Sequence, residues 1–245
     1  MLKSTARNIF SWYNSNCINF RQGVIMVEIR ISEEIKRHSP NARLGIIRSE
    51  IHYQKENSFL WDKIDERISR IENTLKQNGI TSLPVIHHTR QAYLAIGKEP
   101  ARYRCSAEAL LRRVIKKKGL YKVNNVVDMI NFISLSYQFS IGCYDYNQIR
   151  GEIVFDIGRK DETYQAIGRG KMNIEDLPVF RDNKGAFGSP TSDSERTKIT
   201  DKTREIVVVI IDFNKSESLQ ESMEKTLFCL KQYAAAKNAH YSIII

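Results

Sequence analysis

The sequence predicts an α+β fold, and three observations lead to it. Helical patterns fill most of the first half of the 245-residue chain, strand patterns fill most of the second half, and a long helix and a strand close the chain. Helices and strands that are grouped in this way are typical of α+β layering. No stretch rich in Pro, Gly or Ser divides the chain, so we expect a single domain.

The predicted domain spans residues 26–245. The first 27 residues contain three cations and no acid. A start of this kind, with Arg, Ser and Asn, fits a transit peptide, and it also fits an upstream extension. We favour an extension over residues 1–25, because periodic patterning begins near Met26 in MVEIRISEEI.

Short strands and helices are expected in the first half of the domain. Ser32 precedes a small helix with Glu33 and Glu34 in its first turn, where acids complement the helix dipole. Ser106 is the expected N-cap of a later helix. Two strands are expected, a short one that begins near residue 26 and a second one over residues 42–53. The expected helices cover residues 32–39, 59–75, 88–96, 107–119 and 124–135.

Strands separated by turns with Gly, Asp and Asn are expected in the second half. The run VVVII at 207–211 is apolar without alternation, which predicts a strand that is covered on both faces. The expected strands cover residues 139–144, 152–156, 179–181 and 206–211, followed by a helix at about 216–237 and a strand from 240.

Composition narrows the classes of partner and cofactor. The net charge of +10 favours polyanionic partners such as RNA, DNA or an anionic lipid surface. The chain has no apolar stretch long enough for a membrane-spanning helix, so we expect no membrane association. The four cysteines lie far apart with no CxxC pair, and the five histidines show no ligand spacing. We expect a cytoplasmic protein with no metal site and no cofactor.

The run RYRCSAEALLRRVIKKK at 102–118 holds seven cations and a single acid, Glu108. Clustered Lys and Arg bind nucleic-acid phosphates whatever the base sequence. Cations in the last turn of a helix also stabilise its C-terminal end without any ligand. Both interpretations stay open from the residues alone.

Two further stretches are candidates for chemistry. The loop GAFGSPTSDSERTKIT at 185–200 is rich in hydroxyls and backbone donors, which suits anion binding, although a surface loop that caps its own turns explains it as well. Cys143 is flanked by apolar residues, and we expect it to pack rather than to react.

The stretch VNNVVDMINFISL at 123–135 has the apolar density of a helix and four short polar side chains. Asn124 or Asn125 is the expected N-cap, and Asn125 is preferred. Asp128 and Asn131 lie one turn apart on the same face. Asp128 is expected mainly to hold the local packing, and Asn131 is the residue expected to meet a ligand.

NNVVDMINFISL followed by FSIGCYDYNQIRGEIVF resembles the B3/B4 domain of the phenylalanyl-tRNA synthetase beta subunit, where the run is of the type NNVVDxTNY…GxPxHAFDxDKIxG.I. The resemblance continues through RDNKGAFGS and SERTKITDKTREIVVVI and covers roughly residues 90–213. It extends more loosely to both ends of the chain, which look like those of stand-alone proteins built around this domain. It implies a three-layer sandwich of mixed sheets with helices packed on one side. The chain is too short for a synthetase and shows no ATP-using domain.

In the synthetase this domain hydrolyses the ester of mischarged aminoacyl-tRNA. The resemblance therefore implies tRNA or aminoacyl-tRNA as a partner and, if the protein is an enzyme, deacylase activity in trans. Gly142 departs from the pattern, because it stands where the synthetase has histidine. The implied residues are Asn131, Ser192 and Asp193 for catalysis, then Asp128, Gly142, Asp145, Gly188, Ser189 and Glu195 for the substrate pocket, and Arg102, Arg104, Arg112, Arg113, Lys116, Lys117 and Lys118 for tRNA phosphates.

Two alternatives to a deacylase stay open. One is a non-catalytic module that binds RNA or an amino acid, and the other is a binder of a small metabolite in the same pocket. Gly142 favours the module, because glycine offers only space and a backbone N–H where the pattern has a hydrogen-bonding imidazole. The polar loop at 189–195 leaves room for catalysis.

Overall fold

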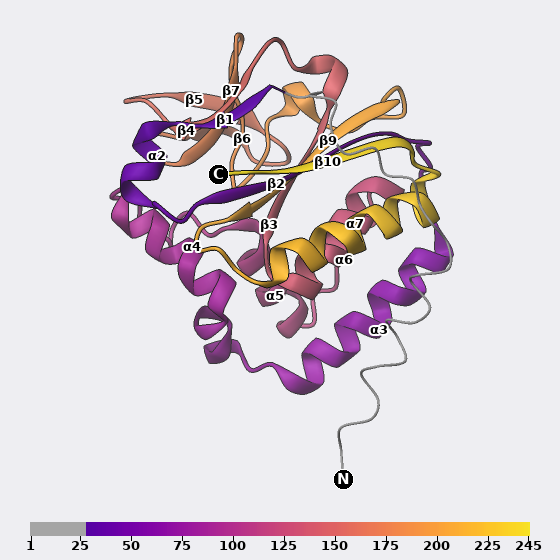
Figure 1. The fold of residues 1–245 in the computed structure, drawn as a ribbon. Coiled ribbons are helices and arrows are strands. Elements are labelled where there is room, and N and C mark those ends of the chain that lie inside the picture. The colour runs from indigo at the N-terminus through magenta and orange to yellow at the C-terminus, as the bar shows by residue number, and fades with distance from the viewer. Residues whose placement is uncertain (1–27) are drawn as a thin grey trace.

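The structure is a computed structural model that describes residues 28–245 (Figure 1). The extension expected over residues 1–25 lies outside the described residues. The predicted α+β class is confirmed, since the described chain combines helices with several sheets. The helices are α2 (Glu33–His38), α3 (Ser58–Thr74), α4 (Pro84–Ala95), α5 (Ser106–Ile115), α6 (Asn125–Tyr137) and α7 (Ser218–Ala234), with 3₁₀ turns η1 (Gln77–Ser82), η2 (Tyr146–Gln148) and η3 (Glu195–Thr197). The strands are β1 (Ile29–Ile31), β2 (Arg43–Glu50), β3 (Ser140–Asp145), β4 (Ile153–Ile157), β5 (Thr163–Ala166), β6 (Gly170–Asn173), β7 (Pro178–Asp182), β8 (Gly185–Gly188), β9 (Glu205–Asp212) and β10 (Lys237–Ile244).

Two four-stranded sheets organise these elements. The first, which we call the β9 sheet, has the order β10-β2-β9-β3 and is antiparallel throughout. The second, the β4 sheet, has the order β1-β4-β7-β8 and is mixed, because β1 pairs parallel with β4 while the other pairs are antiparallel. β5 and β6 form a separate hairpin. Mixed pairing was thus correctly expected for the β4 sheet and wrongly for the β9 sheet.

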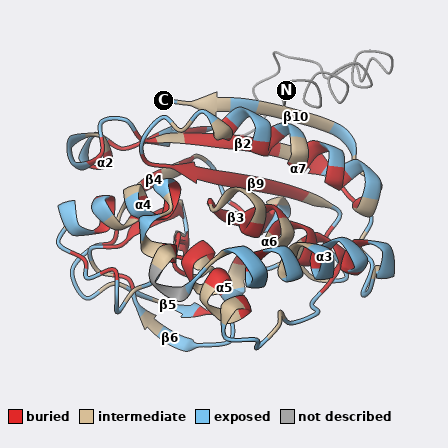
Figure 2. Ribbon diagram, turned by 90° about the horizontal axis from the view of Figure 1, so that it is seen from below, coloured by how far each residue is buried: buried red, intermediate tan, exposed pale blue. Residues whose placement is uncertain are grey.

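The β9 sheet lies between helices and the β4 sheet. On one face, Val208 and Ile210 pack into a core with residues of α3, α6 and α7. On the other face, Val207 and Val209 pack into a second core with residues of the β4 sheet, including Phe180. Because side chains alternate along a strand, β9 is covered on both faces, as VVVII predicted. Figure 2 shows it as a buried strand along nearly its whole length.

Two predicted helix caps are wrong by one residue. Asn124, and not Asn125, caps α6, and its side chain accepts the N–H groups of Val126 and Val127. At α5 the N-cap is Cys105, and Ser106 is the first helical residue. The Ser106 N–H donates to the carbonyl of Pro190 at 2.7 Å, so a loop distant in sequence satisfies this donor without a serine cap.

Three short strands were missed in the second half. The hairpin β5–β6 is partly exposed and has little apolar alternation, so it gives a weak strand signal. β8 takes up the first four residues of the segment that was read as one loop at 185–200. The remaining loop, residues 189–194, leads from β8 towards β9 and contains most of the predicted catalytic residues.

Candidate functional site

Tyr144 of β3 lies over two glycines and between the two sheets. A Cβ atom at Gly142 would stand 2.1 Å from the Tyr144 hydroxyl oxygen, and one at Gly188 would stand 2.2 Å from it. The ring packs edge-on against Phe187, with centroids 4.9 Å apart. An aromatic ring over a strand glycine restores the packing that the glycine lacks. The space at Gly142 is therefore filled by a phenol, and both glycines are required by it.

Asp193 receives the hydroxyl of this tyrosine. Tyr144 donates to Asp193 Oδ1 at 2.8 Å. Burial raises the pKa of the Asp193 carboxyl to about 7, and the hydrogen bonds from Tyr144 and from the backbone of Ser189 oppose part of that shift. The residue keeps partial exposure, which leaves solvent within reach. A carboxyl that titrates near neutral pH can take up and release a proton under ordinary conditions.

The loop at 189–194 is held by its own hydroxyls. Ser189 Oγ accepts the N–H of Thr191 at 3.3 Å and that of Ser192 at 3.1 Å, and the Tyr164 hydroxyl lies 3.1 Å from it. The Ser194 N–H donates to the carbonyl of Phe187. These backbone donors stabilise the loop itself, so they do not face an incoming anion. These contacts are those expected of a surface loop that caps its own turns.

Asp145 and Asp128 are placed away from Asp193. Asp145 follows Tyr144 on the strand and points to the opposite face, where it accepts Asn147 N–H at 3.0 Å and Thr203 Oγ1 at 2.8 Å. Asp128 accepts the indole N–H of Trp61 at 2.8 Å and the N–H of Val123 at 2.9 Å. Burial raises the pKa of Asp128. Both carboxylates are engaged in local hydrogen bonds, and the pocket role given to them above stays a prediction.

The predicted catalytic and pocket residues do not all lie at one site. Gly142, Gly188, Ser189 and Asp193 meet around Tyr144. Asn131 is half-buried on α6, in the helical layer on the other side of the β9 sheet, and Ser192 is half-buried in the loop. Glu195 is exposed and pairs with Lys198.

Glu108 forms ion pairs with two arginines of the basic run at 102–118 and with one arginine outside it. Its buried carboxylate pairs with Arg90 at 3.0 Å, with Arg112 at 2.7 Å and with Arg104 at 3.8 Å. Arg112 is therefore occupied within the fold. The exposed cations of the run flank α5 on both sides, with Arg102 and Arg104 before it and Lys116, Lys117 and Lys118 after it.

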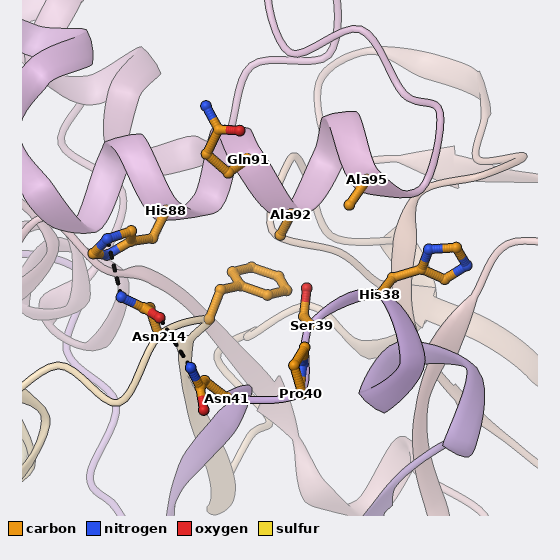
Figure 3. A pocket seen from close by; sticks show the side chains of 10 residues that line it. His38, Ser39, Pro40, Asn41, His88, Gln91, Ala92, Ala95 and Asn214 are labelled. Atoms are coloured by element: carbon orange, nitrogen blue, oxygen red, sulfur yellow. Dashed lines mark hydrogen bonds between the residues drawn. The ribbon is translucent and has the colours of Figure 1, made fainter.

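A separate pocket of about 270 Å³ lies between the end of α2, helix α4 and the residues after β9 (Figure 3). Asn214 joins its two sides, since it contacts His88 Nε2 at 3.0 Å and accepts from Asn41 at 3.3 Å. The described lining consists of amides, imidazoles, a hydroxyl and apolar groups, and it contains no predicted site residue.

Three further features of the described residues concern metal binding, membrane-spanning helices and the reactivity of a thiol. Residues 28–245 contain no cluster of three or more His, Cys, Asp or Glu side chains suited to a metal ion. No helix in this range is long and apolar enough to cross a membrane. Burial raises the pKa of the Cys143 thiol, which disfavours the thiolate, in line with the packing role expected for it.

Several known proteins are similar to this chain. Residues 88–233 match the B3/4 domain family. The phenylalanine–tRNA ligase beta subunit of Fusobacterium nucleatum is 26% identical over 126 residues, which is 50% of this chain and 16% of that protein. The same subunit from Symbiobacterium thermophilum is 25% identical over 120 residues, or 48% of this chain and 14% of that protein.

The chain thus spans about a sixth of the length of these curated relatives. A solved N-terminal fragment of the phenylalanyl-tRNA synthetase beta subunit from Pyrococcus horikoshii aligns with 90% of this chain and 52% of its own, at 15% identity and a TM-score of 0.49. The family match, which covers more than half of the chain, confirms the resemblance stated above. The chain belongs to the B3/4 domain family, whose relatives include the phenylalanyl-tRNA synthetase beta subunit.

Proposed function

We propose that this protein binds tRNA and hydrolyses the ester of mischarged aminoacyl-tRNA in trans, with Asp193 as the general base. The observation that carries the proposal is the 2.8 Å hydrogen bond from the Tyr144 hydroxyl to Asp193 in a loop of the B3/4 domain, and burial there raises the pKa of the carboxyl to about 7. A general base works best when its pKa lies near the operating pH. The relationship to tRNA ligase beta subunits supplies the substrate class.

The proposed reaction begins at a water molecule beside Asp193. The carboxylate takes a proton from this water while the oxygen attacks the ester carbonyl carbon. The ester C–O bond then breaks, and the proton passes from the Asp193 carboxyl to the departing ribose oxygen. The products are a free amino acid and tRNA, and Asp193 returns to its starting state.

The other residues position the substrate in this proposal. The Tyr144 hydroxyl orients the Asp193 carboxylate through its 2.8 Å hydrogen bond. Ser192, half-buried in the same loop, offers a hydroxyl to the ester. β3 is an edge strand of the β9 sheet, and in this proposal the substrate passes around that edge to meet Asn131 of α6. The order helices, β9 sheet, β4 sheet supports assignment to the three-layer sandwich of the synthetase domain.

Substrate size follows from Tyr144 in the same proposal. Its phenol fills the space beside Gly142 and Gly188, which a bulky amino-acid side chain would otherwise enter. We therefore expect esters of small amino acids to be hydrolysed in preference to those of aromatic ones.

The test is incubation of the purified protein with tRNAs that carry correct and incorrect amino acids, followed by measurement of ester hydrolysis. The wild type should hydrolyse at least one mischarged tRNA, and Asp193→Asn should hydrolyse the same tRNA at least about 100-fold more slowly. Asp201→Asn is the matched control, because Asp201 is an exposed acid in the same half of the domain. Hydrolysis that is absent from every substrate, or that is undiminished in Asp193→Asn, contradicts the proposal.

One observation favours a second candidate, a non-catalytic RNA-binding module. Tyr144 occupies the space at Gly142, where the synthetase pattern has histidine, and the backbone donors of the loop are used within it. A module of this kind would bind tRNA without hydrolysing any ester, so the same incubation distinguishes the two candidates.

A further inference from the structure

The segment between α5 and α6, KKKGLYK at 116–122, forms an exposed surface with an aromatic side chain among cations. Its four lysines are exposed, and Tyr121 keeps 69% of its surface accessible. We call residues 116–122 the lysine segment. It contains no acid, and the two carboxylates nearest in sequence are buried and engaged elsewhere, Glu108 with arginines and Asp128 with Trp61. The positive charge of the segment is therefore not neutralised by them.

Tyr121 is held in place from one side. The Arg113 guanidinium carbon lies 3.9 Å from the centroid of the Tyr121 ring, and Arg113 also donates to the carbonyl of Lys118 at 3.2 Å. The guanidinium is thus fixed between the segment and the ring. Since one face of the ring contacts Arg113 and most of the side chain is accessible, the other face is open to a planar partner.

The far end of the segment is anchored as well. The Lys122 ammonium lies 5.0 Å from the centroid of the Trp61 ring. Trp61 donates to Asp128, which also accepts the N–H of Val123 directly after the segment. Contacts to α3 and α6 therefore anchor Lys122 and Val123, directly after Tyr121.

We propose that the lysine segment binds a short single-stranded stretch of RNA, with an unpaired base stacked on Tyr121 and adjacent phosphates on the lysines. Cations along a surface attract any polyanion, but an open aromatic face beside them adds affinity for a ligand with flat rings between its charges. An acidic peptide or an anionic membrane would also use the lysines, and a membrane interface would also take up the Tyr121 ring, but neither has bases whose removal weakens binding. The inference rests on the proposed function in one respect, because a tRNA substrate supplies the RNA.

A matched control lies on another helix. Phe228 of α7 is also exposed, at 42%, and has the Lys225 ammonium 4.9 Å from its ring centroid. It shares the pairing of a cation and an aromatic ring, but Glu221 and Glu224 lie on the same helix and no lysine cluster flanks it. Phe228→Ala therefore removes a comparable ring from a surface that should not bind RNA.

The experiment measures binding of a fluorescein-labelled single-stranded RNA of about eight nucleotides, and of an abasic strand of equal length, by fluorescence anisotropy. Tyr121→Ala should weaken binding of the base-containing RNA by roughly 5- to 100-fold, the range for loss of one stacked base. It should leave the abasic strand unaffected. Tyr121→Phe should retain the affinity for the base-containing RNA, and Phe228→Ala should change the affinity for neither RNA. Replacing Lys116, Lys117 and Lys118 together by alanine should weaken the binding of both the base-containing RNA and the abasic RNA.

The inference is overturned if Tyr121→Ala binds the base-containing RNA as tightly as Phe228→Ala does. It is also overturned if vesicles of anionic lipid bind the wild type more tightly than the RNA does and Tyr121→Ala leaves both affinities unchanged. Deacylation is measured in parallel. RNA binding that depends on Tyr121 without any hydrolysis refutes the proposed function alone, and hydrolysis with RNA binding indifferent to Tyr121 refutes this inference alone.

Discussion

The group of residues around Tyr144 and Asp193 (Gly142, Gly188 and Ser189) and the lysine segment differ in how far their charges are exposed to solvent. Asp193 lies in the loop after β8, where it accepts the Tyr144 hydroxyl, and burial raises its pKa to about 7. The lysine segment keeps its charges in solvent, where salt screens them. Burial makes a group sensitive to pH, whereas exposure makes a surface sensitive to ionic strength. Under the proposals above, the chemical step should follow pH and RNA binding should follow salt, so the two regions can be separated experimentally.

The largest expected effect is on the chemical step. Asp193→Asn keeps an acceptor for the Tyr144 hydroxyl but removes the base, so the single-turnover rate of ester hydrolysis should fall about 10²- to 10⁴-fold. RNA affinity should stay within about twofold of the wild type. A parallel loss of rate and affinity would show that the two regions are not separate. Circular dichroism of the variant should confirm that it folds.

The second effect tests the packing of Tyr144 on the glycines. Gly142→Ala should lower the free energy of unfolding by about 1–3 kcal/mol, since the new methyl group meets the phenol. Gly79→Ala is the control, because the nearest heavy atom to its added Cβ lies at 3.5 Å. Urea denaturation measures both.

A double-mutant cycle makes this assignment specific. In a Tyr144→Ala background the same Gly142→Ala change should cost much less, because the clashing ring is absent. An equal cost in both backgrounds would mean that Tyr144 is not what excludes a side chain at Gly142.

The third effect is the pH dependence of stability. The folded pKa of Asp193, about 7, lies above the usual value for an aspartate, so the folded state binds more protons than the unfolded state between about pH 4 and pH 7. This contribution to stability is present at low pH and is lost as the pH rises through 7. Asp193→Asn should therefore gain stability relative to the wild type as the pH rises from 4 to 7, by at most about 1.4 kcal/mol for each pH unit. Thermal unfolding across this range measures the difference, and a constant offset would argue against a buried, titrating Asp193.

The smallest effect belongs to the lysine segment. Lys118→Ala should reduce the slope of log affinity against log salt by about 0.7, the value for one contact with a single strand. The affinity for RNA should fall a few-fold at low salt, and the hydrolysis rate at saturating tRNA should not change. A slope equal to that of the wild type would exclude Lys118 from the phosphate contacts.

Much of the fold could be predicted because its signals are local. The amphipathic repeat of α3 and the unbroken apolar run of β9 identify their own elements, and both are present in the structure. The N-cap of α6 was missed by one residue because Asn124 and Asn125 have equal propensity to cap. Asn125 is instead used in tertiary contacts, with its amide donating to the carbonyls of His52 and Tyr233.

The site was harder to predict because its contacts join distant segments. The loop acid Asp193 was selected through the family resemblance, but its partner Tyr144, 49 residues earlier, was not. Strand alternation placed Tyr144 on the face of Gly142, and that local signal could have indicated a ring over a glycine. The contact with Gly188 depends on how the two sheets pack, which no local pattern encodes.

The most direct test of the central claim is the pH profile of single-turnover hydrolysis of a mischarged tRNA, corrected for the spontaneous reaction. With Asp193 as the base, the rate should rise tenfold per pH unit below about 7 and level off above it. The residual rate of Asp193→Asn should lack this bend. A profile that bends at the same pH in both proteins, or no hydrolysis at any pH, would contradict the account.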